Sequence, residues 1–510
     1  MPDADEPEVA VAPGRARRAA LVGLRVVAGT VGIVASVAII GAVGLLPLPS
    51  HRIAVPTQTV TPDPTDQVRV CPGALLRLGD ESGQNVNTPS SLGAPSVSSA
   101  GIGADLVSAP LALSDAGTGG GPSAPDQLTI PPTAGGTLAG AQSQRADAGD
   151  YTGFAAADCA EPSGSIWLVG GSTAVGRSTL LTLANPTPVD ATVELTILSA
   201  GGPVSAPGMA GIVVKAGAQR VIPLAGFAPD VASPVVHVTA TGGRVVAFLQ
   251  QSTVRGLDAG GIDLVGEGSA PARHLVIPGV RVLDAVGVNK ALALPDWDDA
   301  AAAVRLVVPG ATGAKVQVSL VPENATLDGL SFEVDVSSGE VTELGLDSGA
   351  DTDSGGVTIP DGVYTVVIDS DQPVVAGVRV TTAVDPVPAD PTATDTMAPA
   401  SDFAWFDPSP ALTDNTPVSI AQGPSPMLSA MNPTTAAITL TLDAKGGGAS
   451  LSLLVPAGGS ASIGVDPGTT YLLTNASGLF AAVSYADDAR LAHYPIVSAG
   501  PVSGPIVIHP

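Results

Sequence analysis

The segment 171–178, GSTAVGRS, has glycines and a final serine at nearly the spacing of a phosphate-binding loop. Arg177 replaces the lysine of that motif. A phosphate-binding loop leads into a helix whose amino terminus receives the phosphate, whereas the alternation of residues in 179–183 predicts a strand. We therefore interpret 171–178 as a loop between strands.

Asp351 and Asp353 have the alternating spacing of oxygen ligands in a calcium-binding loop. An EF-hand also needs a ligand at its fifth position and a glutamate at its twelfth, where this chain has Gly355 and Gly362. The two aspartates remain candidates for a looser calcium site, and a solvated acidic turn is the simpler interpretation.

Trp297 is surrounded in sequence by Asp296, Asp298 and Asp299. An aromatic face flanked by carboxylates suits a pyranose ring, so Trp297, if exposed, is a candidate glycan contact. An ordinary surface group is the alternative. Trp167 and Trp405 precede similar turns, and we interpret both as repeated core residues.

Other chemistry finds little support in the sequence. The five histidines are scattered and form no zinc motif, and there is no Gly-x-Ser-x-Gly nucleophile turn. Paired carboxylates able to hydrolyse glycosides are not excluded among 47 acidic residues. Enzymes usually line their clefts with aromatic and polar residues, and aromatic residues make up only 3% of this chain. We expect no cofactor and no catalytic activity.

The net charge of −26 belongs to the region after residue 25, because residues 1–25 carry equal numbers of acidic and basic side chains. An acidic surface repels phosphate groups, so nucleic acid is not an expected partner.

Residues 26–46 are uncharged and follow a cluster of arginines at positions 15, 17, 18 and 25. A helix of this length spans about 31 Å, enough to cross a bilayer once. Arginines on the amino-terminal flank predict a cytoplasmic tail, 1–25, and an extracellular remainder. A cleaved signal peptide is the alternative, but its apolar core is normally shorter than this run.

Cys71 and Cys159 would both be extracellular, where disulfides persist, so one bridge is expected and free thiols are the alternative. The proline- and threonine-rich stretch 47–66 predicts an extended stalk. Residues 67–150 begin with a strand around Cys71, and the Gly-, Ser- and Ala-rich part that follows predicts a flexible insert.

Three sequence elements recur in the same order at offsets of about 123 residues. They are LLTLANPT, VRLVVPGA and MLSAMNPT from residues 180, 304 and 427; AGAQRVIPL, SGEVTELGL and AGGSASIGV from 216, 338 and 457; and strand-like segments from 242, 371 and 477. Short Val-, Thr- and Ile-rich runs with a period of two predict strands. The expected fold is all-β, with about three tandem immunoglobulin-like β-sandwich modules at 151–260, 270–385 and 400–510. A propeller is disfavoured, because its blades repeat every 40 to 50 residues.

Cys159, the segment SIWLVGGST from residue 165 and the turn LANPT from residue 183 resemble a family of actinobacterial membrane-anchored extracellular proteins, domain-of-unknown-function family 5719. The similarity covers nearly all of the expected extracellular region. It implies a cell-envelope setting and a link to surface-polysaccharide assembly, and it supplies no catalytic residues.

Together these features predict a single-pass, membrane-anchored extracellular protein that acts as a structural or interaction component of the cell envelope. Its partner would be an envelope protein or a glycan. A carbohydrate-binding surface protein is the alternative, and an envelope hydrolase is the third interpretation.

Overall fold

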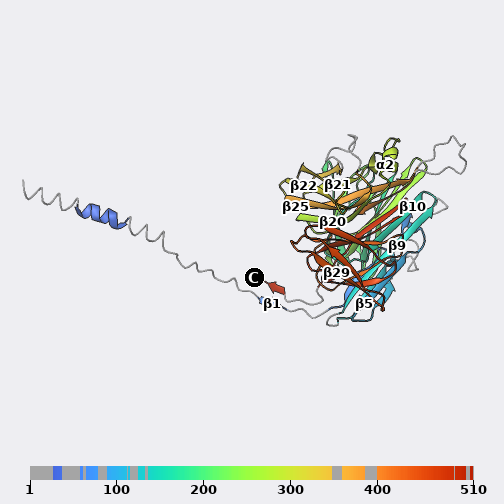
Figure 1. Ribbon diagram of the computed structural model, residues 1–510, viewed down its shortest axis with the longest axis horizontal. Helices are drawn as coiled ribbons and strands as arrows, with labels where there is room; N and C mark the ends of the chain where they lie inside the picture. Colours follow the sequence, from blue (N-terminus) through green and yellow to red (C-terminus); the bar gives the residue numbers. More distant parts are fainter. Residues whose placement is uncertain are drawn as a thin grey trace, which may run out of the picture. The chain divides into compact units, whose positions relative to one another are not determined.

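The computed structural model describes residues 27–36, 58–60, 65–78, 89–111, 113–114, 124–132, 136–346, 359–384, 399–487, 489–500 and 506–508. Nearly all regular structure among these residues is β-strand (Figure 1). The prediction of an all-β fold is confirmed.

The chain forms two compact parts, Met1–Pro62 with Gly504–Pro510, and Asp63–Ser503. The first part contains a helix over 27–36 and an antiparallel pair, β1 (Gln58–Val60) with β35 (Ile506–Ile508). No helix in the described portion of the chain is both long enough and apolar enough to cross a membrane. The predicted membrane segment 26–46 lies partly outside the described residues. We call the second part, Asp63–Ser503, the body.

The body consists of four repeats of one strand plan. Each complete repeat is built on two sets of four paired strands, which we name the ring sheet and the flanking sheet; in repeat 2 one further short strand pairs with each set. The second, fifth, seventh and eighth strands form the ring sheet, and the first, third, fourth and sixth form the flanking sheet.

Repeat 2 has the ring sheet β19-β18-β12-β16 and the flanking sheet β11-β17-β13-β15. Its strands are β11 (Ser165–Val169), β12 (Arg177–Asn185), β13 (Ala191–Ser199), β14 (Gly202–Pro203), β15 (Ile212–Val214), β16 (Ala218–Pro223), β17 (Val235–Gly242), β18 (Val246–Arg255) and β19 (Asp258–Val265), with the 3-10 helix η1 (Leu224–Gly226) after β16.

Repeat 3 follows the same plan, except that one long strand, β25, runs through both sheets. Its elements are β20 (Ala272–Val282), α2 (Ala285–Ala291), η2 (Asp298–Ala300), β21 (Ala303–Val307), β22 (Ala314–Pro322), β23 (Leu330–Val336), β24 (Val341–Gly345), β25 (Gly362–Val384) and β26 (Ala400–Phe406).

Repeat 4 has the ring sheet β34-β33-β28-β31 and the flanking sheet β27-β32-β29-β30. Its strands are β27 (Thr416–Ser419), β28 (Met427–Met431), β29 (Ile438–Ala444), β30 (Leu451–Val455), β31 (Ser460–Gly464), β32 (Thr470–Thr474), β33 (Phe480–Asp487) and β34 (Arg490–Pro495).

Repeat 1 has the sheets β10-β9-β5 and β2-β8-β6, which match the other repeats with the fourth and fifth strands missing among its described residues. Two further short strands, β3 and β4, pair with each other, and β7 pairs in parallel with β16 of repeat 2. The bounds are β2 (Gln67–Val70), β3 (Leu76–Leu78), β4 (Pro89–Ser91), β5 (Ser96–Ile102), β6 (Val107–Pro110), β7 (Leu113–Ser114), β8 (Asp126–Ile130), β9 (Thr137–Ala148) and β10 (Tyr151–Asp158).

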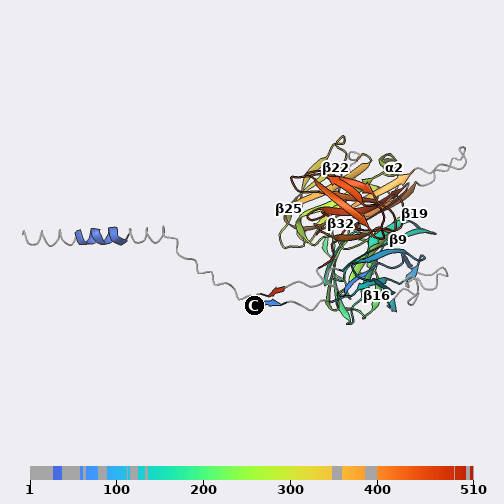
Figure 2. The same cartoon turned by 60° about the horizontal axis from the view of Figure 1, so that its bottom comes forward.

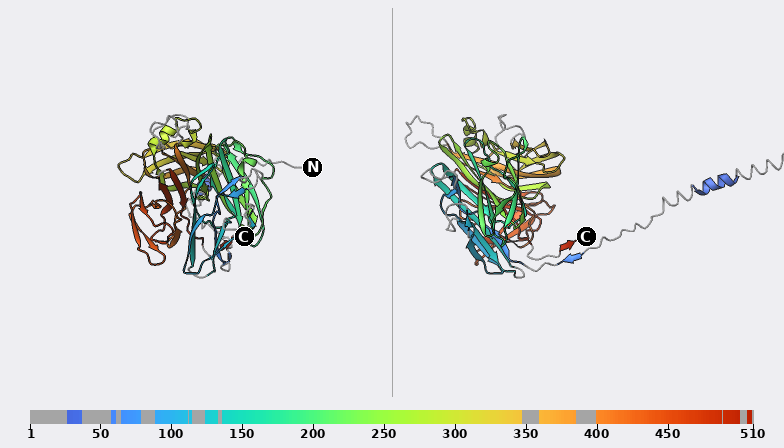
Figure 3. Two further views of the ribbon diagram at one scale, coloured as in Figure 1. Left: turned by 90° about the vertical axis from the view of Figure 1, so that its right-hand side faces the viewer. Right: turned by 180° about the vertical axis from the view of Figure 1, so that it is seen from behind.

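The last strands of the four repeats form a closed ring in the middle of the body. β10 contacts β19, β19 contacts β26, β26 contacts β34, and β34 contacts β10. The first and last repeats are therefore neighbours, as the blue and red strands in Figure 3 show. In Figure 2, β22 and β32 of repeats 3 and 4 lie above β9 and β16 of repeats 1 and 2.

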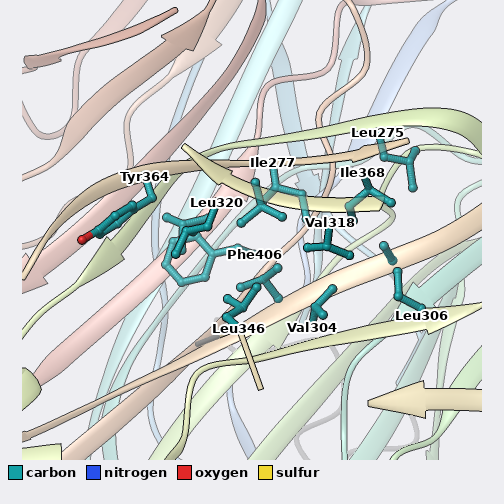
Figure 4. Packing of buried hydrophobic residues seen from close by; sticks show 14 of the residues in the cluster. Leu275, Ile277, Val304, Leu306, Val318, Leu320, Leu346, Tyr364, Ile368 and Phe406 are labelled. Carbon is teal, nitrogen blue, oxygen red and sulfur yellow. The ribbon is translucent and has the colours of Figure 1, made fainter. Parts of the chain in front are cut away.

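Strands of the flanking sheets, such as β13 and β22, bury every second side chain between the two sheets. In β22, Val316, Val318 and Leu320 are buried while Lys315 and Gln317 are exposed. The buried residues join those of β20, β21, β25 and β26 in one cluster (Figure 4). Each buried aliphatic side chain contributes about 1.5–3 kcal/mol, so this alternation holds the two sheets together.

The three sets of recurring sequence elements occupy equivalent positions in the structure. The first set forms β12, β21 and β28, the second forms β16, β24 and β31, and the third lies in β18, β25 and β33. All nine segments belong to ring sheets, so the internal repeat in the sequence corresponds to a repeat in the structure. The turns after β12 and β28 are also alike: the amides of Asn185 and Asn432 donate to Val189 O and Ala436 O, each at 2.8 Å.

The predicted organisation needs two corrections. The stretch within 67–150 that we expected to be a flexible insert is mostly strand where it is described, and it forms repeat 1. The predicted modules also divide the chain differently, because β10 closes repeat 1 and β26 closes repeat 3. A propeller blade is a single sheet and repeats every 40 to 50 residues. Each repeat of this protein supplies two sheets, so a period of about 123 residues is compatible with sheets arranged in a ring.

Candidate functional site

Asp402 lies at the centre of the ring and has no solvent exposure. Its Oδ2 accepts hydrogen bonds from the backbone N–H of Phe154 on β10 at 2.8 Å and of Leu491 on β34 at 3.2 Å. Its Oδ1 accepts from Ile262 on β19 at 3.1 Å and from Phe403 at 3.0 Å. One carboxyl group thus joins all four ring strands.

Two glycines provide the space for this carboxyl group. A Cβ atom at Gly153 would lie 2.6 Å from Asp402 Oδ1, and one at Gly261 would lie 2.8 Å from it. Both glycines also have positive φ angles, 129° and 120°, which side-chain-bearing residues rarely adopt. Burial raises the pKa of Asp402 well above its usual range, while the four N–H donors stabilise its charged form.

A second buried cluster joins repeats 2 and 3. The guanidinium of Arg305 lies 4.3 Å from the ring centre of Trp405, and its Nε donates to Glu343 Oε2 at 2.6 Å. Its Nη1 donates to the carbonyls of Gly171 and Pro234 at 3.0 and 2.8 Å. The polar groups of this cluster bond to one another and to backbone carbonyls, so we interpret the cluster as structural.

The carboxyl ends of the ring strands open onto a cavity of about 650 Å³, which we call the mouth cavity. All four segments that follow the ring strands line it: 160–165 after β10, 267–270 after β19, Pro410 after β26 and Val497 after β34. Arg69 of β2 and Arg244, between β17 and β18, complete the lining. The closed ring positions every one of these segments.

Arg69 is held firmly at this cavity, with a side chain only 5% exposed. Its Nη1 donates to Cys159 O at 3.1 Å and lies 3.5 Å from Asp158 Oδ2. Its Nη2 donates to Val497 O at 3.1 Å and lies 3.4 Å from Glu161 Oε1. Arg69 therefore connects repeat 1 with the end of repeat 4, while its buried Nε has no hydrogen-bond partner.

Two carboxyl groups of the mouth cavity, those of Asp158 and Glu267, have raised pKa values. Burial, opposed by the charge of Arg69, raises the pKa of Asp158 to about 6. Burial and the neighbouring charges of Asp158 and Glu161 raise the pKa of Glu267 to about 7. Glu267 forms no hydrogen bond or ion pair with any described residue, so its carboxyl group is available to a ligand.

The model of the family described as "Family of unknown function (DUF5719)" matches residues 119–470. The chain belongs to this family. The DUF5719 match covers repeats 2 and 3, the latter part of repeat 1 and most of repeat 4. A search of curated proteins found no match.

Two motifs from the sequence of this DUF5719 protein come together in the structure. Arg177, from the segment that resembles a phosphate-binding loop, donates through Nε to Asp299 Oδ2 at 2.9 Å. Arg255 reaches Asp299 Oδ1 at 2.7 Å and lies 4.2 Å from the ring centre of Trp297. Burial opposes ionisation of Asp299, but the hydrogen bond from Arg177 and the nearby arginine charges hold its pKa well below the usual range.

Trp297, the candidate glycan contact, is buried, so the expectation that it is exposed is wrong. Its side chain is 4% exposed, because Arg255 covers the ring and Ala291, Ala300 and Ala383 pack around it. Residues 177–185 form a strand, so 171–178 has no helix to receive a phosphate, as predicted.

The other predicted residues have different outcomes. Cys71 and Cys159 form the expected disulfide, in the small core of repeat 1. Trp405 is buried in the core of repeat 2, whereas Trp167 is half-buried and stacks on His237 with 4.0 Å between ring centres. Asp351 and Asp353 lie outside the described residues. No group of three metal-ligating side chains occurs among the described residues.

Sequence reasoning missed the residues of the ring and its mouth. Asp402 was hidden among 47 acidic residues, and its three partner strands are far away in the chain. Arg69 offered a clearer signal, because it lies two residues before Cys71 and the disulfide brings it to Asp158. Glu267 follows β19, the last strand of repeat 2. The sequence patterns did not identify β19 as the end of a repeat.

Proposed function

We propose that this protein is a non-catalytic, membrane-anchored extracellular interaction protein of an actinobacterial-type cell envelope. The uncharged run 26–46 would anchor it, and the repeats would act as rigid immunoglobulin-like modules. The disulfide between Cys71 and Cys159 supports an oxidising compartment, where such bonds persist. The partner would be an envelope protein of surface-polysaccharide assembly.

The observation that carries this proposal is the convergence of the four post-ring segments on the mouth cavity. A surface whose segments are fixed by a closed ring is ordered before a partner arrives, which lowers the entropy lost on binding. We therefore place the docking site at the mouth.

One nucleophile–base pair occurs beside the cavity, between Ser165 Oγ and His237 Nε2 at 2.9 Å. In a serine hydrolase a third group orients the histidine through its other ring nitrogen. No described residue bonds His237 Nδ1, and the ring instead stacks on Trp167. We therefore interpret the pair of Ser165 and His237 as a structural contact and not as a catalytic one.

In-cell photo-crosslinking tests the docking site. A photoreactive phenylalanine analogue would replace Ser163 at the mouth or, as the control, Leu257 in the turn before β19 at the opposite end of the ring strands. Leu257 is 94% exposed, so its crosslinking reports unspecific neighbours.

We expect a defined envelope protein to be recovered from the Ser163 position and not from the Leu257 position. Identical adducts from both positions, or none from Ser163, would contradict a docking site at the mouth. An alkaline phosphatase fused after residue 66 tests the placement: activity in intact cells is expected, and its absence would refute export.

A further inference from the structure

The mouth cavity has the size and the mixture of polar groups of a small-molecule site. Its volume of about 650 Å³ lies within the range of roughly 300–1,000 Å³ that is typical of ligand pockets. Its lining combines carboxylates, guanidinium groups and the hydroxyls of Ser163, Ser165 and Ser269 with glycine, alanine and proline.

Two charged groups in the lining of this cavity, Arg244 and Glu267, form no hydrogen bond or ion pair with any described residue. Arg244 is exposed and Glu267 is partly buried. The carboxyl group of Glu267 also lies near the charges of Asp158 and Glu161. A ligand that accepts from Arg244 and donates to Glu267 would use both groups.

The charges select the class of ligand. A cationic ligand would meet the guanidinium groups of Arg69 and Arg244, and an anionic one would meet Asp158, Glu161 and Glu267. A hydroxyl group donates one hydrogen bond and accepts others, so a neutral, hydroxyl-rich molecule avoids both repulsions and uses both kinds of lining group.

We propose that the mouth cavity binds a neutral saccharide unit, with Glu267 accepting from its hydroxyl groups and Arg244 donating to them. This inference rests on the proposed extracellular placement and names the ligand of the docking site. The cavity lining contains no aromatic side chain for stacking against a sugar ring, so the hydrogen bonds carry the affinity.

Saturation-transfer NMR on the full-length protein tests the inference, in a detergent without a sugar headgroup. The probes are neutral oligosaccharides of glucose, galactose, mannose and arabinose, two to six units long. The variant is Glu267→Gln, which keeps the shape and removes the charged acceptor. The matched control is Glu340→Gln, an exposed glutamate in the turn between β23 and β24.

We expect at least one oligosaccharide to bind the wild-type protein and the Glu340→Gln variant equally, and the Glu267→Gln variant at least tenfold more weakly. Failure of every oligosaccharide to bind, or equal binding to both variants, would overturn the inference. Binding of spermidine in place of any saccharide would also overturn it.

Each of the two proposals can be refuted without refuting the other. Protein adducts from the Ser163 position without saccharide binding would leave the interaction role intact and remove the saccharide. Saccharide binding that depends on Glu267, without protein adducts, would establish the ligand and remove the protein partner.

Discussion

Replacing Asp402 by asparagine should loosen the whole ring. Asparagine keeps one oxygen, which can serve two of the four backbone N–H donors, and turns an NH₂ group toward the other two. A buried donor without an acceptor costs about 1–3 kcal/mol, so two cost about 2–6 kcal/mol. Removing a buried charge offsets part of this. We expect a net loss of about 3 kcal/mol.

Two measurements check this prediction. Urea unfolding of the full-length protein should show a lower midpoint for Asp402→Asn, while Asp258→Asn, an exposed control at the start of β19, should match the wild type. Hydrogen exchange followed by mass spectrometry should show faster exchange in peptides containing Phe154, Ile262 and Leu491. Unchanged exchange in these three strands would refute the assignment of Asp402 as the joint of the ring, whatever the urea midpoint.

Three further variants test other parts of the body. Replacing Cys71 and Cys159 together by serine should lower stability by about 4–5 kcal/mol, because the bridge closes a loop with a sequence separation of 88 residues; urea unfolding measures this. Arg305→Met should cost about 3–5 kcal/mol, since the buried Glu343 loses one of its two arginine partners and the carbonyls of Gly171 and Pro234 lose their donor; thermal unfolding should show it. Glu267→Gln should change the pH dependence of unfolding, which urea titrations at pH 4.5 and pH 8 compare.

The sign for Glu267 follows from its raised pKa. The folded protein binds this proton more tightly than the unfolded chain does, so the stability from protonation is complete below about pH 4.5 and is lost as the pH rises through about 7. The loss is at most about 3 kcal/mol for a shift of this size. Glutamine does not titrate, so the variant should gain on the wild type at pH 8, and an equal pH dependence would contradict the prediction.

The results that would contradict the other two predictions are equally direct. A cysteine-free protein as stable as the wild type would show that repeat 1 does not depend on its cross-link. A stable Arg305→Met protein would mean that Arg379, which already lies 3.1 Å from Glu343, is a sufficient partner for it.

The sequence predicted the complete repeats because strands of their flanking sheets alternate between core and solvent. In β13, Ala191, Val193 and Leu195 are buried and the residues between them are exposed, so the pattern is visible. In repeat 1 that signal is absent. The central residues of β9 are buried on both faces, and they include Gln142, Ser143 and Gln144, which bond to neighbouring segments. A strand that is buried on both faces and made of small or polar residues shows no alternation of apolar and polar positions. Its sequence is therefore typical of a loop.

The site could not be predicted from local patterns. Trp297 and its aspartates had the composition of a surface sugar contact, and only the folded chain brings Arg177 and Arg255 over them. The disulfide was within reach because two cysteines allow a single intramolecular pair. The mouth cavity depends on the order of four strands around a ring, and no window of sequence contains that order.

Closure of the ring has a consequence for the synthesis of the protein. Repeat 1 is made first, yet Arg69 reaches its acceptor Val497 and Asp402 receives the N–H of Leu491 only after almost the whole body has been translated. A nascent or truncated chain ending before β34 holds three ring strands around a carboxylate with an unfilled side. Such a chain would leave the sides of β10 and β26 that β34 contacts uncovered, so proteases should cut it faster than the finished protein.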